Sequence, residues 1–173
     1  MRKQGFTLIE ILVYIVVLVV ILIAVISFIN WSIRINAKAK ISVETLNSAK
    51  RIMEIMNYEI RSSKSIYNPT SVFGLNPSQL SLETTNHLPS GEEVTFIDFY
   101  LCGEQLCLKT ESQDPVALNT SSIKIDNLIF EEIISNDKSS IRIDLTASYN
   151  GQSELSEYQS TVNLKSTISP RFY

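Results

Sequence analysis

The sequence predicts an α+β fold: one long N-terminal helix, membrane-spanning in its first half, packed on an antiparallel β-sheet head. Two observations support this prediction. No glycine or proline occurs from Phe6 to Asn68, so 63 residues contain no helix breaker. The later part of the chain, by contrast, contains strand patterns, and over residues 141–149 apolar residues recur with a period of two. One long helix followed by consecutive strands is typical of an α+β domain.

The first half of the predicted helix is apolar on all sides. The run from Ile11 to Ile33 contains 23 residues without a charge. A bilayer core is crossed by about 20 apolar helical residues, each rising 1.5 Å. We therefore expect residues 6–33 to form a transmembrane helix in contact with a lipid bilayer.

The second half of the helix, residues 34–66, is amphipathic. Its apolar residues follow one another at steps of three and four: Leu46, Ala49, Met53, Met56 and Ile60. Charged residues between them are expected on the outward face: Lys50, Arg51, Glu54 and Glu59. Polar residues 61–65 and the following Pro69 predict the end of the helix. The helix then contains about 57 residues and is about 85 Å long.

Residues 67–173 are expected to form a β-rich head. A short strand is predicted around residues 80–82, and a hairpin over residues 94–111 with its turn at residues 103–106. Another strand is predicted over residues 123–130, where the alternation slips at Asn127 and indicates a bulge.

The clearest strand pattern covers residues 141–149, in which the odd-numbered positions are apolar and the even-numbered ones polar. Asn150 and Gly151 follow, and this dipeptide is typical of a tight hairpin. The return strand is expected over residues 157–165, with Tyr158, Val162 and Leu164 facing inward.

The charge of the chain is unevenly distributed. Residues 1–5 carry two cations, residues 6–63 carry six cations and four acids, and residues 64–173 carry seven cations and fourteen acids. The head is therefore acidic, whereas nucleic-acid binding needs clustered lysine and arginine. We expect no nucleic-acid partner, and an acidic surface keeps an exported head soluble.

The two cysteines, Cys102 and Cys107, have four residues between them. A pair this close forms either a local disulfide or no bond. A zinc site is disfavoured, because it needs about four ligands and His87 is the only histidine. If the head is exported, its compartment is oxidising and favours a disulfide between Cys102 and Cys107.

The sequence contains no recognisable catalytic constellation. Its five glycines do not cluster into a phosphate-binding loop, and His87 stands alone among polar residues, without a nucleophile beside it. We therefore expect neither enzyme activity nor a cofactor. Calcium is the alternative, because acids gather without EF-hand spacing at Glu92 and Glu93, and at Asp126, Glu131 and Glu132.

The most informative residue is Glu10, at the leading edge of the apolar run. It ends the stretch Gly5-Phe6-Thr7-Leu8-Ile9-Glu10, which follows Arg2 and Lys3. A charged side chain near the membrane core costs a few kcal/mol, so such residues usually have a partner. The preceding cations lie about two helical turns away. Glu10 therefore either extends its carboxylate into interfacial water or has a partner from another subunit.

This N-terminus resembles the type IV prepilin leader shared by pilins and type II secretion pseudopilins: basic residues, a glycine, Phe-Thr-Leu-Ile-Glu and an apolar helix. The resemblance implies that a prepilin peptidase cleaves between Gly5 and Phe6 and that the new amine of Phe6 is methylated. It also implies that Glu10 pairs with the N-terminal amine of a neighbouring subunit during assembly. Residues 1–5 are then the leader, 6–33 the transmembrane helix, 34–66 its amphipathic continuation and 67–173 the head.

The same resemblance implies partners and a location. The partners are the prepilin peptidase, other pilins or pseudopilins, and an inner-membrane assembly platform. The chain would cross the inner membrane once, with a cytoplasmic N-terminus and an exported head, and would enter a filament on assembly. Charge alone leaves this orientation open, because Arg34, Lys38 and Lys40 flank the other end of the span. The leader, helix and mostly β head resemble the larger minor pseudopilins, of the J type.

Other interpretations explain this N-terminus less completely. A secretory signal peptide could end at Ala37-Lys38-Ala39, but the apolar run exceeds the usual length of about 7–15 residues and begins with an acid. A plain single-pass anchor gives no reason for the glycine, phenylalanine and glutamate of the leader. A head that captures DNA or a surface ligand is a further alternative, although its acidity disfavours DNA. A single-pass enzyme or sensor lacks catalytic groups.

Overall fold

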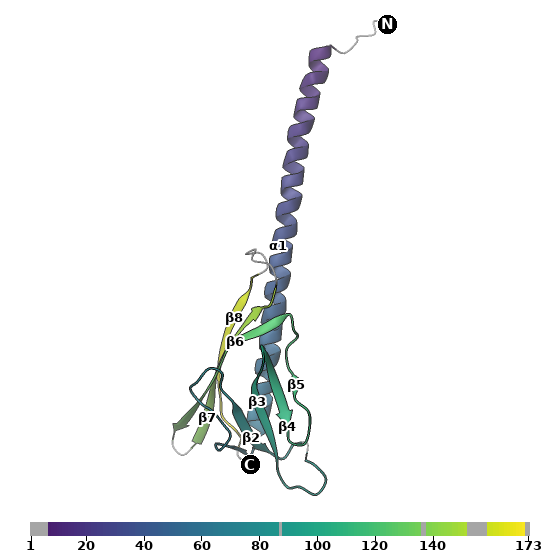
Figure 1. Cartoon of the computed structure of the whole chain (residues 1–173). Coiled ribbons are helices and arrows are strands. Elements are labelled where there is room, and N and C mark those ends of the chain that lie inside the picture. The colour runs from purple at the N-terminus through teal and green to yellow at the C-terminus, as the bar shows by residue number, and fades with distance from the viewer. Residues whose placement is uncertain (1–6, 87, 136–137, 152–158, 172–173) are drawn as a thin grey trace.

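A computed structural model describes residues 7–86, 88–135, 138–151 and 159–171. In these residues the chain forms one helix, α1 (Leu8–Ser62), followed by eight strands in two antiparallel sheets. Figure 1 shows the N-terminal half of α1 projecting from the head, with the strands gathered around its C-terminal half. The predicted α+β architecture, a long helix on a β-rich head, is confirmed.

Helix α1 contains 55 residues and continues without interruption past residue 33, where the apolar run ends. The flanking residues Thr7 and Ser63 are both extended, with φ/ψ of −80°/150° and −70°/147°. The Ser63 hydroxyl donates a hydrogen bond to the Ile60 carbonyl at 2.8 Å. This contact satisfies one of the carbonyls that lack an intrahelical partner at a helix end.

The first sheet is a meander with the strand order β1-β2-β3-β4-β5. Its strands are β1 (Ser65–Ile66), β2 (Leu80–Thr84), β3 (Thr95–Cys102), β4 (Gln105–Thr110) and β5 (Val116–Ala117). The second sheet has the order β6-β7-β8 and contains β6 (Ile123–Ser135), β7 (Lys138–Tyr149) and β8 (Thr161–Ile168). The sequence suggested a single sheet. Two are formed because β5 pairs with β4 over only two residues and does not pair with β6.

One hydrophobic core joins the helix to both sheets. Helix α1 contacts β7 and β8 of the second sheet, and strands β2 and β3 of the first sheet contribute to the same buried cluster. Four residues of the predicted apolar stripe are buried in it: Ala49, Met53, Met56 and Ile60. Leu46, the first of the stripe, is only half-buried.

The buried face of α1 is wider than the predicted stripe. Ile52 is fully buried, and Glu59 is only 8% exposed. The prediction that Glu59 lies on the outward face is therefore wrong, whereas Lys50, Arg51 and Glu54 are exposed as expected. The difference arises because the core contains residues of two sheets, which cover a broader arc of the helix than one sheet would.

The β3–β4 hairpin turns more tightly than predicted. Cys102 pairs with Gln105, so the loop consists of Gly103 and Glu104 rather than of residues 103–106. Gly103 has a φ of +70°, and glycine at the first loop position permits a primed turn that matches the twist of the strands. Leu106 consequently lies in β4, where it is fully buried, and its burial favours the shorter loop.

The second sheet confirms the predicted bulge and shifts the last strand. The register of β6 against β7 changes between Ile125 and Asn127. The return strand, β8, begins at Thr161 and ends at Ile168, three residues beyond the predicted end at residue 165. Residues 152–158, which contain most of the connection to β7, lie outside the described residues. Ile168 is buried, which accounts for the extension of the strand toward the C-terminus. Val162 and Leu164 pack on the core as predicted, and Tyr158 lies outside the described residues.

Candidate functional site

The candidate functional site is the N-terminal end of α1. Glu10 lies in the first turn of the helix, and the backbone N–H groups of Glu10 and Ile11 donate to the Thr7 carbonyl at 3.1 and 3.3 Å. An acid in this turn is favoured by the partial positive charge of the helix N-terminus. Gly5 and Phe6, the predicted cleavage and methylation residues, lie outside the described residues.

Glu10 is far from the head of its own chain. The first helix residue that the head buries is Ile41, and the helix rises about 46 Å between these two positions. Within the part of the chain that the structure describes, Glu10 takes part in no ion pair. The head is too distant to supply a cation to this carboxylate.

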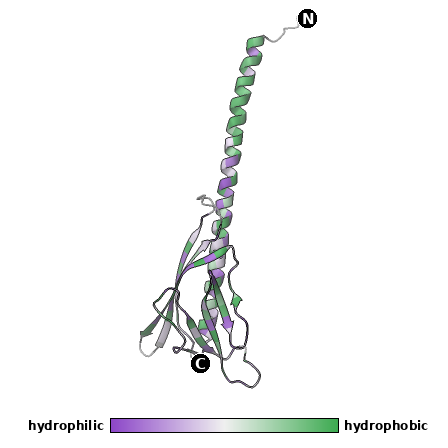
Figure 2. Ribbon diagram, viewed as in Figure 1, coloured by the Kyte–Doolittle hydropathy of each residue, from purple (hydrophilic) through white to green (hydrophobic). Residues whose placement is uncertain are grey.

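The helix between Glu10 and the head is exposed around its whole circumference. Its large apolar side chains all face outward, and Phe28 and Trp31 near its end are 64% and 60% exposed. Figure 2 shows this half of α1 as almost continuously hydrophobic. By length and composition the helix could cross a membrane. Such a surface is stable only against lipid or against other helices.

A short cationic stretch separates this apolar segment from the head. We call residues 34–40 the neck. The neck contains Arg34, Lys38 and Lys40 and no acid, and the side chains of these three residues are exposed. Figure 2 shows the change from hydrophobic to hydrophilic residues above the head. From sequence alone, these three cations made the membrane orientation of the chain ambiguous. The structure places them between the apolar segment and the head.

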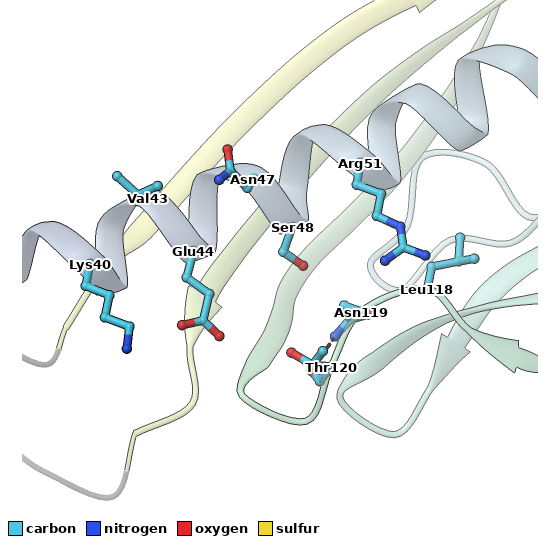
Figure 3. Close-up of a pocket in the computed structure, with 9 residues that line it drawn as sticks. All are labelled: Lys40, Val43, Glu44, Asn47, Ser48, Arg51, Leu118, Asn119 and Thr120. Atoms are coloured by element: carbon cyan, nitrogen blue, oxygen red, sulfur yellow. Dashed lines mark hydrogen bonds between the residues drawn. The ribbon is translucent and has the colours of Figure 1, made fainter.

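A cleft lies where the head meets the helix, and its volume is about 500 Å³. Its lining combines one helix face with the segment between β5 and β6: Lys40, Val43, Glu44, Asn47, Ser48, Arg51, Leu118, Asn119 and Thr120. Figure 3 shows the Arg51 side chain extending toward Leu118. The lining contains neither histidine nor cysteine. This cleft could not be predicted from the sequence, because its two sides lie about 70 positions apart in the chain.

The predicted disulfide between Cys102 and Cys107 is present, with their Cα atoms 5.8 Å apart. The register of β3 against β4 places the two cysteines diagonally rather than directly opposite each other. The hairpin tip also touches the second sheet, since the Ile125 N–H donates to the Glu104 carbonyl at 2.9 Å. The disulfide therefore closes the hairpin where the two sheets meet.

Two of the acids named for calcium form ion pairs with cations on the second sheet. Asp126 forms an ion pair with Lys124 at 3.2 Å, and Glu131 forms one with Arg142 at 3.1 Å. Over the described ranges, no three potential metal ligands come together. His87 lies outside those ranges.

Comparison with known proteins identifies the N-terminus alone. The family model for the prokaryotic N-terminal methylation motif matches residues 1–26. This match includes Gly5, Phe6 and Glu10. No curated protein and no solved structure matches the chain. The motif, the long apolar helix and the α+β head are together consistent with a type IV pilin-like protein.

Proposed function

We propose that this type IV pilin-like chain is a structural subunit of a type IV pilus or a type II secretion filament. It is made as a precursor in the inner membrane, with its N-terminus in the cytoplasm and its head exported. The prepilin peptidase cleaves it after Gly5 and methylates Phe6. It then assembles with other pilins or pseudopilins on an inner-membrane platform. The large head, residues 67–173, favours a minor subunit of the J type over a major one.

The position of Glu10 is the observation that supports this proposal most. The carboxylate stands at one end of a helix whose head begins about 46 Å away. Cleavage after Gly5 creates a positively charged amine on Phe6, which is the kind of group the carboxylate needs. When subunits lie side by side with an axial offset, the amine of one can meet Glu10 of another.

The energetics of the pair between Glu10 and a neighbouring amine favour a role in setting the axial register between subunits. An unpaired charge in a low-dielectric environment costs several kcal/mol, whereas a well-paired one is tolerated. The pair therefore penalises wrong axial offsets more than it adds net stability. A subunit shifted by one helical turn would leave both its own carboxylate and a neighbouring amine without a partner.

The rest of the helix suits the same role. Apolar side chains on all sides of the span can contact lipid before assembly and neighbouring helices afterwards. The span contains no glycine or proline, where many major pilins carry one. We infer that this helix stays continuous in the filament rather than unwinding locally.

The proposal is tested by comparing Glu10→Ala with Glu44→Ala in cells that make the native filament. Glu44 is the next acid along the helix and is exposed near the cleft, so it serves as a matched control. Glu10→Ala should be cleaved normally, as judged by the loss of five residues in mass. Its incorporation into sheared filaments should fall on the order of 100-fold, the cost of leaving one buried charge unpaired.

Glu44→Ala should be incorporated like the native chain, because its carboxylate lies in water beside the head. Normal incorporation of Glu10→Ala would contradict the proposed pairing. Absence of the native chain from purified filaments would contradict the subunit role itself.

A further inference from the structure

We propose that the neck, residues 34–40, binds anionic lipid headgroups in the leaflet at the head end of the span. The proposal rests on the proposed function for the orientation of the chain, since that leaflet is the exported one when the head is exported. It assigns a lipid ligand to a cationic segment that the filament role does not use. The bound lipid would hold the subunit at a fixed depth in the membrane before assembly.

The position of the neck fits the headgroup layer. It starts directly after Ile33, the last residue of the uncharged run, and ends before Ile41, the first helix residue buried by the head. Seven residues of helix are about 10 Å long, and each polar layer of a bilayer is roughly 5–7 Å thick. When the apolar run fills the hydrocarbon core, the neck must therefore lie among the headgroups.

The residues before the neck are those of a membrane interface. Phe28 and Trp31 are exposed, and their ring centroids lie 6.1 Å apart. Tryptophan concentrates at the level of the headgroups, because its ring is largely apolar and carries one polar N–H. Trp31 thus marks the boundary of the hydrocarbon core about one turn before Arg34.

Two cations share a helix face with the tryptophan. Trp31, Arg34 and Lys38 follow at steps of three and four, so they lie along one side of α1. Lys40 lies on another side and lines the cleft at the helix–head junction. The ring can thus sit at the glycerol level while the longer Arg34 and Lys38 side chains extend to phosphate oxygens.

The charge pattern makes lipid phosphate the fitting ligand. No acid occurs between Glu10 and Glu44, so the neck as a segment carries a net positive charge. Lysine and arginine are usually more frequent on the cytoplasmic side of a span, and this excess sets its orientation. Three cations at the exported end weaken that signal, so a ligand for them there gives a reason for their position. One lysine or arginine at an anionic surface favours binding about fivefold.

Trp31 is the only tryptophan of the chain, and its fluorescence reports on the lipid beside the neck. The full-length precursor is placed in phosphatidylcholine bilayers that contain a fixed minor fraction of phosphatidylglycerol. The bromine quencher is carried either by phosphatidylglycerol or by the same amount of phosphatidylcholine. We expect the lipid next to Trp31 to be enriched in phosphatidylglycerol about fivefold over the bulk at low salt, with a smaller excess at high salt.

The decisive comparison is between two triple variants. Arg34→Gln/Lys38→Gln/Lys40→Gln should abolish the excess quenching by brominated phosphatidylglycerol. Lys50→Gln/Arg51→Gln/Arg61→Gln removes three exposed cations from the same helix beside the head and should retain it. Circular dichroism checks that both variants keep the native helix and strand content.

Equal quenching by the two brominated lipids in the native chain would overturn the proposal. So would an excess that survives in the neck variant. A neck variant that enters filaments poorly while the native chain shows no lipid preference would instead make the neck a protein contact. The quenching measurement needs neither peptidase nor filament. A negative quenching result therefore does not contradict the proposed subunit role. Conversely, the quenching result can be interpreted even if the chain is not a filament subunit.

Discussion

Asn119 and Leu106 are joined by a hydrogen bond that links the two sheets of the head. The Asn119 Oδ1 accepts from the backbone N–H of Leu106, in β4, at 2.9 Å. Its Nδ2 donates to the carbonyl of Ile123, the first residue of β6, at 2.6 Å. Asn119 is 6% exposed, so both partners lose access to water when they bind it. One buried amide thus spans the gap where pairing between strands stops.

We predict that Asn119→Ala destabilises the head by about 2 kcal/mol, because it leaves a buried N–H and a buried carbonyl without partners. Asn47→Ala is the matched control. Asn47 lines the same cleft but is exposed, and its removal should change stability by less than about 0.5 kcal/mol. Urea unfolding of the full chain in detergent, followed by circular dichroism of the strands, measures both. Equal stabilities of the two variants would show that Asn119 does not couple the sheets.

A second prediction concerns the helix face on which the head packs. Ile52 is fully buried although it lies outside the predicted stripe, and Leu46 is half-buried although it begins that stripe. Ile52→Ala should cost about 3 kcal/mol of stability through lost burial and a cavity. Leu46→Ala should cost about 1 kcal/mol, since it buries less apolar surface. The same unfolding experiment ranks the two variants, and the reverse order would contradict the packing of both sheets on α1.

These two residues also show what sequence can and cannot predict here. The length of α1 was predictable because a stretch without glycine or proline has a strong local preference for helix. Which of its faces is buried was only partly predictable, since that depends on two sheets that form much later in the chain. Glu59 shows the same effect, because its burial follows from the width of the covered arc and not from the local pattern.

The head should lose stability in acid. The Lys165 ammonium, 2.6 Å from Asp144, donates a hydrogen bond that lowers the pKa of this carboxyl below its ordinary value of 3.8, and Asn163 lowers it further. A hydrogen bond from Lys64, and then one from Ser65, lowers the pKa of Glu83 below 4.5. Because each pKa is lower in the folded state, the stabilisation is complete above these ordinary values. It is lost as the pH falls through the folded pKa.

Lys165→Met should therefore reduce the difference in stability between pH 7 and pH 2. The reduction should be below about 1 kcal/mol, because the Lys165 side chain is 65% exposed and solvent screens the pair. Lys109→Met, an exposed lysine on β4, is the control and should leave the pH dependence unchanged. Thermal unfolding of the full chain in detergent at a series of pH values gives the comparison. An unchanged pH dependence in Lys165→Met would remove Asp144 from this account.

The candidate site, too, could be predicted from the sequence only in part. Glu10 and the two residues of the expected cleavage site could be identified from sequence, because a charge beside a long apolar run is a local anomaly with a physical cost. The neck could not be assigned a place from sequence. Its position depends on where the head first covers the helix, at Ile41, and that is decided by strands more than 80 residues further along the chain. The cleft beside Asn119 was not predictable for the same reason.

Processing as a prepilin is best examined by mass spectrometry of the N-terminal peptide of the chain purified from its native membrane. We expect a peptide that begins at Phe6 and carries a methyl group on its amine. Gly5→Leu, which alters the residue before the expected cut, should leave the chain at its full length. A native chain that still begins at Met1, or that begins beyond Ala39, would contradict the account.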